Sequence, residues 1–237
     1  MNYGEEYDKA IVELQHRLGH IFSSPELLRE ALTHKSYANE QLRDSTACNE
    51  RKEFLGDAVL DLVTADFLYH NYPQFPEGEL SRIRAELVSA TALAKVARKL
   101  QLGCCLRLGR GEQRSGGNDK DNLLADALEA VFGAIFIDAG WSVACDVLMS
   151  LFEVAAKQVA GRKSQDYKTR LQELAQAHYG QAPSYELTDV SGPDHQRHYS
   201  VVVCCDGKKL GEGSGSSKKS AQQQAACLAL QKFESTS

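Results

Sequence analysis

The sequence contains no uninterrupted hydrophobic run of membrane-spanning length, no pair of cysteines spaced as C-x-x-C and no excess of positive charge. Its most apolar stretch is interrupted by Asp126, Glu129 and Asp138, so we expect no membrane span. Four acidic residues among the first twenty positions argue against a signal peptide or a transit peptide. The seven cysteines, an odd number, are interpreted as reduced thiols, and we expect a cytoplasmic protein.

The net charge of the chain limits how it could bind a nucleic acid. The formal net charge of −5 would argue against such a partner if the charge were spread evenly. Acids gathered in a metal site would lower the net charge of the whole chain, so binding to phosphates must come from local basic clusters. The length of 237 residues, with 43% hydrophobic and 25% charged residues, suits two soluble domains.

Residues 49–61, NERKEFLGDAVLD, predict a helix with acids gathered on one face. At about 100° per residue, Glu50, Glu53 and Asp57 fall within roughly 60° of one another. These like charges repel, and a divalent cation such as Mg²⁺, which prefers carboxylate oxygens, would remove the repulsion. A solvated acidic face is the alternative interpretation. A second, apolar stripe is expected to face the core: Leu55, Ala58, Val59 and Leu62.

A second helix of the same kind favours the metal interpretation. Residues 122–132 carry Asp126 and Glu129 on one face, and their neighbours are almost wholly apolar. Carboxylates in such surroundings are rarely left unpaired, and two helices that offer inward acids can build a metal site. Residues 77–84 mix glutamates with arginines that could bind phosphate. Together these segments indicate a metal-dependent chemistry on phosphodiesters.

Periodicity divides the chain into a helical part and a mixed part. Six helices are expected first: residues 5–18, 25–33, 47–71, 79–100, 120–139 and 142–160. A glycine-rich loop is expected at residues 110–118, and a short polar linker at residues 160–165. The pattern then predicts a helix, three strands and a helix: residues 167–178, 184–190, 197–205, 209–214 and 217–233. Trp141 and the stripe from Phe132 to Phe136 are interpreted as core, and His34 as a hydrogen-bonded structural residue.

These motifs resemble the ribonuclease III family. Residues 49–57 resemble its signature, which normally reads N-E-R-L-E-F-L-G-D, and residues 33–37, 77–84 and 124–130 resemble three further motifs. The resemblance covers nearly the whole chain. It implies a mainly α-helical, multi-domain protein: an all-α endonuclease domain at residues 1–157, a linker at 158–165 and a small α-β-β-β-α double-stranded-RNA-binding domain at 166–235.

One departure from the family signature is Lys52, which stands where the family usually has leucine. On the predicted helix it lies at the margin of the apolar stripe. Its aliphatic stem could pack there while the amine reaches water.

The resemblance also implies roles for the acids. Glu53, Asp126 and Glu129 would bind Mg²⁺, with Mn²⁺ as a possible substitute; Asp57 and Glu129 would be most directly catalytic. Glu50 and Glu77 would be supporting acids. A homodimer would cut both strands of double-stranded RNA and leave 5′-phosphate and 3′-hydroxyl ends. The family's expected substrates are ribosomal RNA precursors and structured messenger and transfer RNA transcripts.

The small domain resembles the double-stranded-RNA-binding domain most strongly at residues 213–221, GSGSSKKSA. Exposed glycine amides, the positive end of a helix and the charges of Lys218 and Lys219 all attract phosphate. By the resemblance, Gln172, Glu173 and His195 would reach the minor groove of the duplex. For His195, RNA contact and a plain loop surface are equally good interpretations.

Two other classes of function compete with the nuclease. A catalytically silent scaffold that binds double-stranded RNA would have lost one or more of four acids, yet all four are present: Glu53, Asp57, Asp126 and Glu129. A metal-dependent phosphohydrolase for small nucleotides would have no use for the C-terminal domain.

Overall fold

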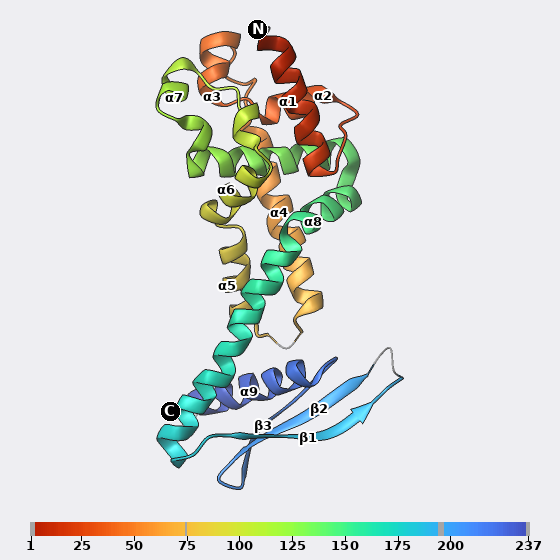
Figure 1. The fold of residues 1–237 in the computed structure, drawn as a ribbon, viewed down its shortest axis with the longest axis vertical. Helices are drawn as coiled ribbons and strands as arrows, with labels where there is room; N and C mark the ends of the chain where they lie inside the picture. Colours follow the sequence, from red (N-terminus) through yellow and green to blue (C-terminus); the bar gives the residue numbers. More distant parts are fainter. Residues whose placement is uncertain (1–2, 74, 194–196, 236–237) are drawn as a thin grey trace. The chain divides into compact units, whose positions relative to one another are not determined.

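The computed structural model describes residues 3–73, 75–193 and 197–235 (Figure 1). Contacts divide the chain into two units. The first unit comprises Met1–Leu68 and Ser81–Ala156, and the second comprises Tyr69–Leu80 and Lys157–Ser237. Each unit has its own hydrophobic core. The order of a helical part followed by a mixed part is therefore confirmed.

The first unit is helical, as the periodicity predicts. Its elements in chain order are α1 (Tyr3–Leu18), α2 (Pro25–Ala31), α3 (Lys35–Tyr37), the π-helical turn η1 (Ala38–Leu42), α4 (Glu50–Asn71), α5 (Glu77–Leu87), α6 (Ala90–Lys99), the 3-10 turn η2 (Leu102–Cys105), α7 (Arg110–Arg114), the 3-10 turn η3 (Gly117–Asp119) and α8 (Asp121–Tyr179). Of these, α4, α5 and α8 continue into the second unit.

Two expected segments differ in detail. The single helix expected at residues 79–100 is two helices, because Ser89 caps the start of α6: its Oγ accepts a hydrogen bond from the Ala92 amide at 3.4 Å. The loop expected at residues 110–118 contains the short helix α7 and the beginning of η3.

The sequence predicted two interruptions within the segment that forms helix α8, and the helix contains only the first. Gly140 has φ +79° and ψ −175°, which interrupts the helix between the two segments that the sequence predicted. Just before it, the Asp138 carboxylate accepts hydrogen bonds from the Ser23 amide at 2.9 Å and from His20 Nε2 at 3.0 Å. The expected polar break at residues 160–165 is wrong, because the α8 backbone remains helical there. A polar segment without proline can continue a helix.

Four side chains lie differently from expectation. Lys52 is buried, and its Nζ lies 2.5 Å from Glu30 Oε1, so its amine pairs with an acid of α2 and does not extend into water as expected. Leu62 is 57% exposed and Ala58 is also exposed. The packed face of α4 is instead formed by Val59, Val63 and the other buried residues of this helix. Trp141 is 40% exposed and is not core.

The apolar section Asp121–Ala160 of α8 is long and apolar enough, by length and composition alone, to cross a membrane. However, Leu128, Val131 and Phe132 are fully buried within the helical core of the first unit. The central helix of a globular domain has the same character, so this section is weak evidence for a membrane span.

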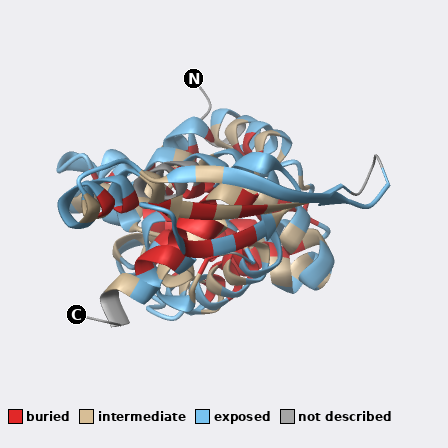
Figure 2. Cartoon of the chain, turned by 90° about the horizontal axis from the view of Figure 1, so that it is seen from below, coloured by how far each residue is buried: buried red, intermediate tan, exposed pale blue. Residues whose placement is uncertain are grey.

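The second unit contains the antiparallel sheet β1-β2-β3 and the helix α9 (Lys218–Ser235). The strands are β1 (Ser184–Ser191), β2 (His198–Cys205) and β3 (Lys208–Gly215). Buried and partly exposed residues alternate along β2 (Figure 2), as expected for a strand with one face on a core. In β3, Gly213 lets α9 come close, since a Cβ there would lie 2.3 Å from the Ala225 amide nitrogen. Strands β2 and β3 are joined by a turn at Asp206-Gly207, with positive φ at both residues.

Candidate active site

Helices α4 and α8 touch through their backbones at two glycines. A Cβ at Gly56 would lie 1.7 Å from the carbonyl oxygen of Glu129, and one at Gly133 would lie 2.3 Å from that of Lys52. No side chain fits at such distances, so only glycine permits this crossing. The crossing places the acidic face of α4 directly beside the acids of α8.

Three carboxylates meet at this crossing. Glu53 comes from α4, Asp126 and Glu129 come from α8, and one carboxylate oxygen of each lies within 4.8 Å of the other two. Each side chain is half-buried. Oxygen ligands bind Mg²⁺ at about 2.1 Å and Ca²⁺ at about 2.3–2.6 Å, so small side-chain rotations would bring all three to one ion. The donor set consists of hard oxygen atoms, which fits such a cation.

The electrostatics of the group agree with a cation site. Burial and then the charges of Asp57, Asp126 and Glu53 raise the pKa of Glu129 to about 7. Burial also raises the pKa of Glu53 and of Asp126, and Asp126 adds to the increase at Glu53. Neighbouring carboxylates in a half-buried place therefore resist ionising together. A bound divalent cation would reverse this effect.

The other predicted acids lie outside this group of three. Asp57 is exposed one turn after Glu53, and among charged groups it makes the largest contribution to the raised pKa of Glu129. Glu50 is exposed and pairs with Lys35, whose Nζ lies 3.1 Å from Glu50 Oε1. Glu77 is the exposed first residue of α5 and belongs to the second unit.

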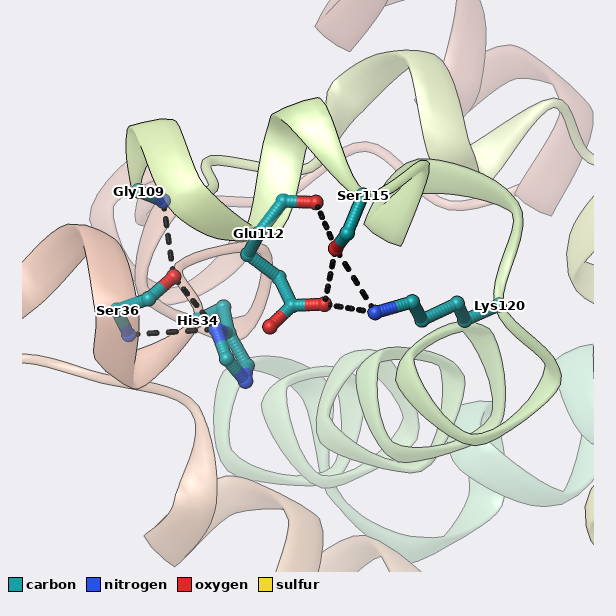
Figure 3. A network of polar contacts seen from close by, with 6 residues as sticks. All are labelled: His34, Ser36, Gly109, Glu112, Ser115 and Lys120. Carbon is teal, nitrogen blue, oxygen red and sulfur yellow. Dashed lines mark hydrogen bonds and ion pairs between the residues drawn. The ribbon is translucent and has the colours of Figure 1, made fainter.

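A polar network borders α3 and α7 (Figure 3). His34 caps α3: its Nδ1 accepts a hydrogen bond from the Ser36 amide at 3.2 Å, and Ser36 Oγ accepts one from the Gly109 amide at 2.8 Å. Glu112 of α7 accepts a hydrogen bond from Lys120 Nζ at 2.6 Å. Burial lowers the pKa of His34, although the charges of Glu112 and Asp126 oppose this. The interpretation of His34 as a hydrogen-bonded structural residue is confirmed. The segment around α7 is partly helical and is not a plain connector.

Four of the five residues predicted to contact RNA lie on two helices of the second unit. Gln172 and Glu173 are exposed on α8, and Lys218 and Lys219 are exposed in the first turn of α9. His195 lies outside the described residues.

Comparison with known proteins covers almost the whole chain. Residues 24–154 match the family model described as ribonuclease-III-like, and residues 167–233 match the double-stranded RNA binding motif. The chain is 46% identical to Ribonuclease 3 of Natranaerobius thermophilus over 94% of this chain and 96% of that protein. It is likewise 46% identical to Ribonuclease 3 of Syntrophotalea carbinolica, over 95% and 98%. The nuclease domain of ribonuclease III from Campylobacter jejuni is 42% identical, with a TM-score of 0.56 over 60% of this chain and 94% of that one.

The chain belongs to the ribonuclease III family. Most of the matched nuclease region lies in the first unit and the matched RNA-binding motif lies in the second. The protein is an endoribonuclease for double-stranded RNA. The mainly helical, multi-domain fold class predicted from the sequence is confirmed.

Sequence reasoning missed the two glycines at which helices α4 and α8 touch. A glycine inside a helix costs roughly 1 kcal/mol relative to alanine, so Gly56 and Gly133 within helical patterns were available signals of close backbone approach. It also missed Lys168 of α8, whose Nζ donates a hydrogen bond to Gln222 of α9. No local pattern distinguishes this lysine from a solvated one.

Proposed function

We propose that Glu53, Asp126 and Glu129 hold Mg²⁺, or Mn²⁺ in its place, and that Asp57 and Glu129 act most directly in hydrolysis of the phosphodiester. The convergence of three carboxylate oxygens within 4.8 Å is the observation that carries this proposal. The bound cation would shield the phosphate charge and make water a better nucleophile.

The protein's own groups supply positioning and proton transfer. In the metal-free site the pKa of Glu129 is raised to about 7, so its carboxyl can hold a proton near neutral pH and would release it when a cation binds. Asp57 is exposed beside it and can accept a proton from an attacking water. Glu50 and Glu77 are the supporting acids that the family resemblance implies. Glu50 holds Lys35, whose charge favours the ionised form of Glu53.

The products and substrates follow the family. Hydrolysis leaves 5′-phosphate and 3′-hydroxyl ends, and the substrates are ribosomal RNA precursors and structured messenger and transfer RNA transcripts in the cytoplasm. Gln172, Glu173 and His195 reach the minor groove, while Lys218 and Lys219 contact phosphates. The domain limits are residues 1–157 for the nuclease, 158–165 for the connection and 166–235 for RNA binding.

The active form is a homodimer in which each copy cuts one strand. Phe54 is 81% exposed and Leu62 is 57% exposed on α4, the helix that carries Glu53. Large apolar side chains exposed beside a catalytic face favour an interface. The Campylobacter jejuni structure is described as showing flexibility in a region involved in dimer formation.

The proposal is tested with the full-length protein and a long labelled RNA duplex, with Mg²⁺ or with excess EDTA. Fragments with 5′-phosphates should form only with Mg²⁺. Glu129→Gln should abolish cleavage and leave duplex binding in EDTA intact, whereas Glu26→Gln, an exposed acid in the first turn of α2, should cut normally. A wild-type protein that binds the duplex and never cuts would favour the scaffold alternative. Loss of binding in Glu129→Gln would show that this residue is structural.

A further inference from the structure

Lys168 lies where three elements of the second unit meet. Its Nζ donates a hydrogen bond to Oε1 of Gln222 on α9 at 2.5 Å. The same Nζ lies 4.6 Å from the centre of the Tyr185 ring on β1, within the range of a cation–π interaction. Both contacts hold the ammonium group in one place. Holding it reduces the side-chain entropy that would be lost when a ligand binds.

The charge of Lys168 is not balanced by a neighbouring acid among the described side chains. The charged group that acts on it is Lys219, and both burial and this second cation lower the pKa of Lys168. Four other lysines each form an ion pair with an acid: Lys35 with Glu50, Lys52 with Glu30, Lys120 with Glu112 and Lys209 with Glu212. A lysine that feels a second cation and no acid among the described side chains favours an anion at its ammonium group.

The position of Lys168 also connects the two surfaces proposed to contact RNA. It precedes Gln172 by four residues on α8, so both side chains lie on the same face of that helix. On its other side it lies beside α9, through Gln222 and Lys219. A lysine ammonium has three donor hydrogens, so the bond to Gln222 leaves two for a phosphate.

We propose that Lys168 is a further phosphate-binding residue, which joins the duplex contact of α8 to the contact at the start of α9. The proposal rests on the proposed function of this unit, in which α8 and α9 both bind duplex RNA. Gln222 and Tyr185 are positioning residues: they fix the ammonium group without contacting RNA themselves.

The test measures binding of the full-length protein to an RNA duplex in EDTA, which prevents cleavage, at several salt concentrations. Lys168→Met keeps most of the aliphatic stem and removes the charge. We expect weaker binding at low salt and a slope of log Kd against log salt smaller by about one. The ratio of variant to wild-type Kd should then fall about fourfold between roughly 50 and 200 mM salt. Lys168→Arg should retain the wild-type slope.

Two further variants separate the possible failures. Lys209→Met removes the same charge from β3 and should leave the salt slope unchanged. An unchanged slope in Lys168→Met, even with a lower melting temperature, would overturn the proposal and leave Lys168 as a structural tie. If Lys218→Ala with Lys219→Ala flattens the slope while Lys168→Met does not, only the inference about Lys168 fails. If neither changes the slope, the proposed RNA contacts of α9 fail as well.

Discussion

At the scale of single residues, the charge of Glu129 makes the stability of the metal-free protein depend on pH. Its pKa rises from 4.5 in the unfolded chain to about 7 in the folded one, so folding favours the protonated form. The stability that this group contributes is present below pH 4.5 and is lost as the pH rises through about 7. In EDTA, Glu129→Gln should therefore raise the melting temperature at pH 8 and change it little at pH 4.5. An equal change at both pH values would contradict the raised pKa.

Lys52 gives a second prediction at this scale. Glu30→Gln leaves a buried ammonium without its partner and should cost about 3 kcal/mol, whereas Lys52→Leu leaves only Glu30, whose side chain is 40% exposed and can be hydrated. Urea unfolding should thus show a clearly larger loss for Glu30→Gln than for Lys52→Leu. Similar losses would mean that an unpaired ammonium at Lys52 costs no more than an unpaired Glu30 carboxylate.

Single residues differ in how well the sequence predicts them. Asp126 and Glu129 could be singled out because acids within an apolar helix are unusual, and this pattern is visible within a short stretch of sequence. The burial of Lys52 could not be foreseen, because its partner Glu30 belongs to another helix, α2. A contact between helices leaves no trace in the periodicity of either one.

At the scale of elements, the crossing of α4 and α8 determines whether the carboxylates meet. Gly133→Ala introduces a Cβ 2.3 Å from the Lys52 carbonyl oxygen, which should cost about 1–3 kcal/mol in stability and separate Glu53 from Asp126. Cleavage should fall at least about tenfold, since small misplacements of catalytic groups are costly. Assays with saturating duplex, together with thermal unfolding, would measure both effects.

Gly111→Ala is the matched control for this change, because a Cβ at Gly111 of α7 would meet nothing within 4 Å. It should cut RNA normally and be no less stable than the wild type. Normal cleavage by Gly133→Ala would show that the helix spacing is not what assembles the site.

Elements with their own start and stop residues could be predicted, and others could not. The break at Gly140 and the turn at Asp206-Gly207 follow from glycine's freedom to adopt positive φ. The continuation of α8 through residues 160–165 does not follow, because an exposed helix and a linker share the same polar composition. The capped start of α6 depends on one serine within an otherwise continuous helical pattern.

At the scale of the whole molecule, the proposed dimer depends on the exposed apolar face of α4. Phe54→Ser removes about 1.5–3 kcal/mol of burial from each of two copies, so the dimer should dissociate at least about a hundredfold more readily. Sedimentation over a range of concentrations would measure this, and Val12→Ser, an exposed apolar residue of α1, should leave the dimer unchanged. A Phe54→Ser protein that remains as dimeric as the wild type would place the interface elsewhere.

The order of the two units could be predicted from the change in periodicity alone, but the outer face of α4 could not. Leu62 fits an apolar stripe in the sequence and is nevertheless exposed. Helical spacing shows which residues share a face. It does not show whether that face covers the same chain or a second copy.

The contact of Gly56 and Gly133 has a genetic consequence. Every missense codon at either position adds at least one carbon where two backbones already touch. No replacement is conservative there, whereas an exposed acid such as Glu50 has chemically similar substitutes. A saturation library selected for RNA cleavage should therefore recover only synonymous codons at these two positions, including in variants that keep every carboxylate.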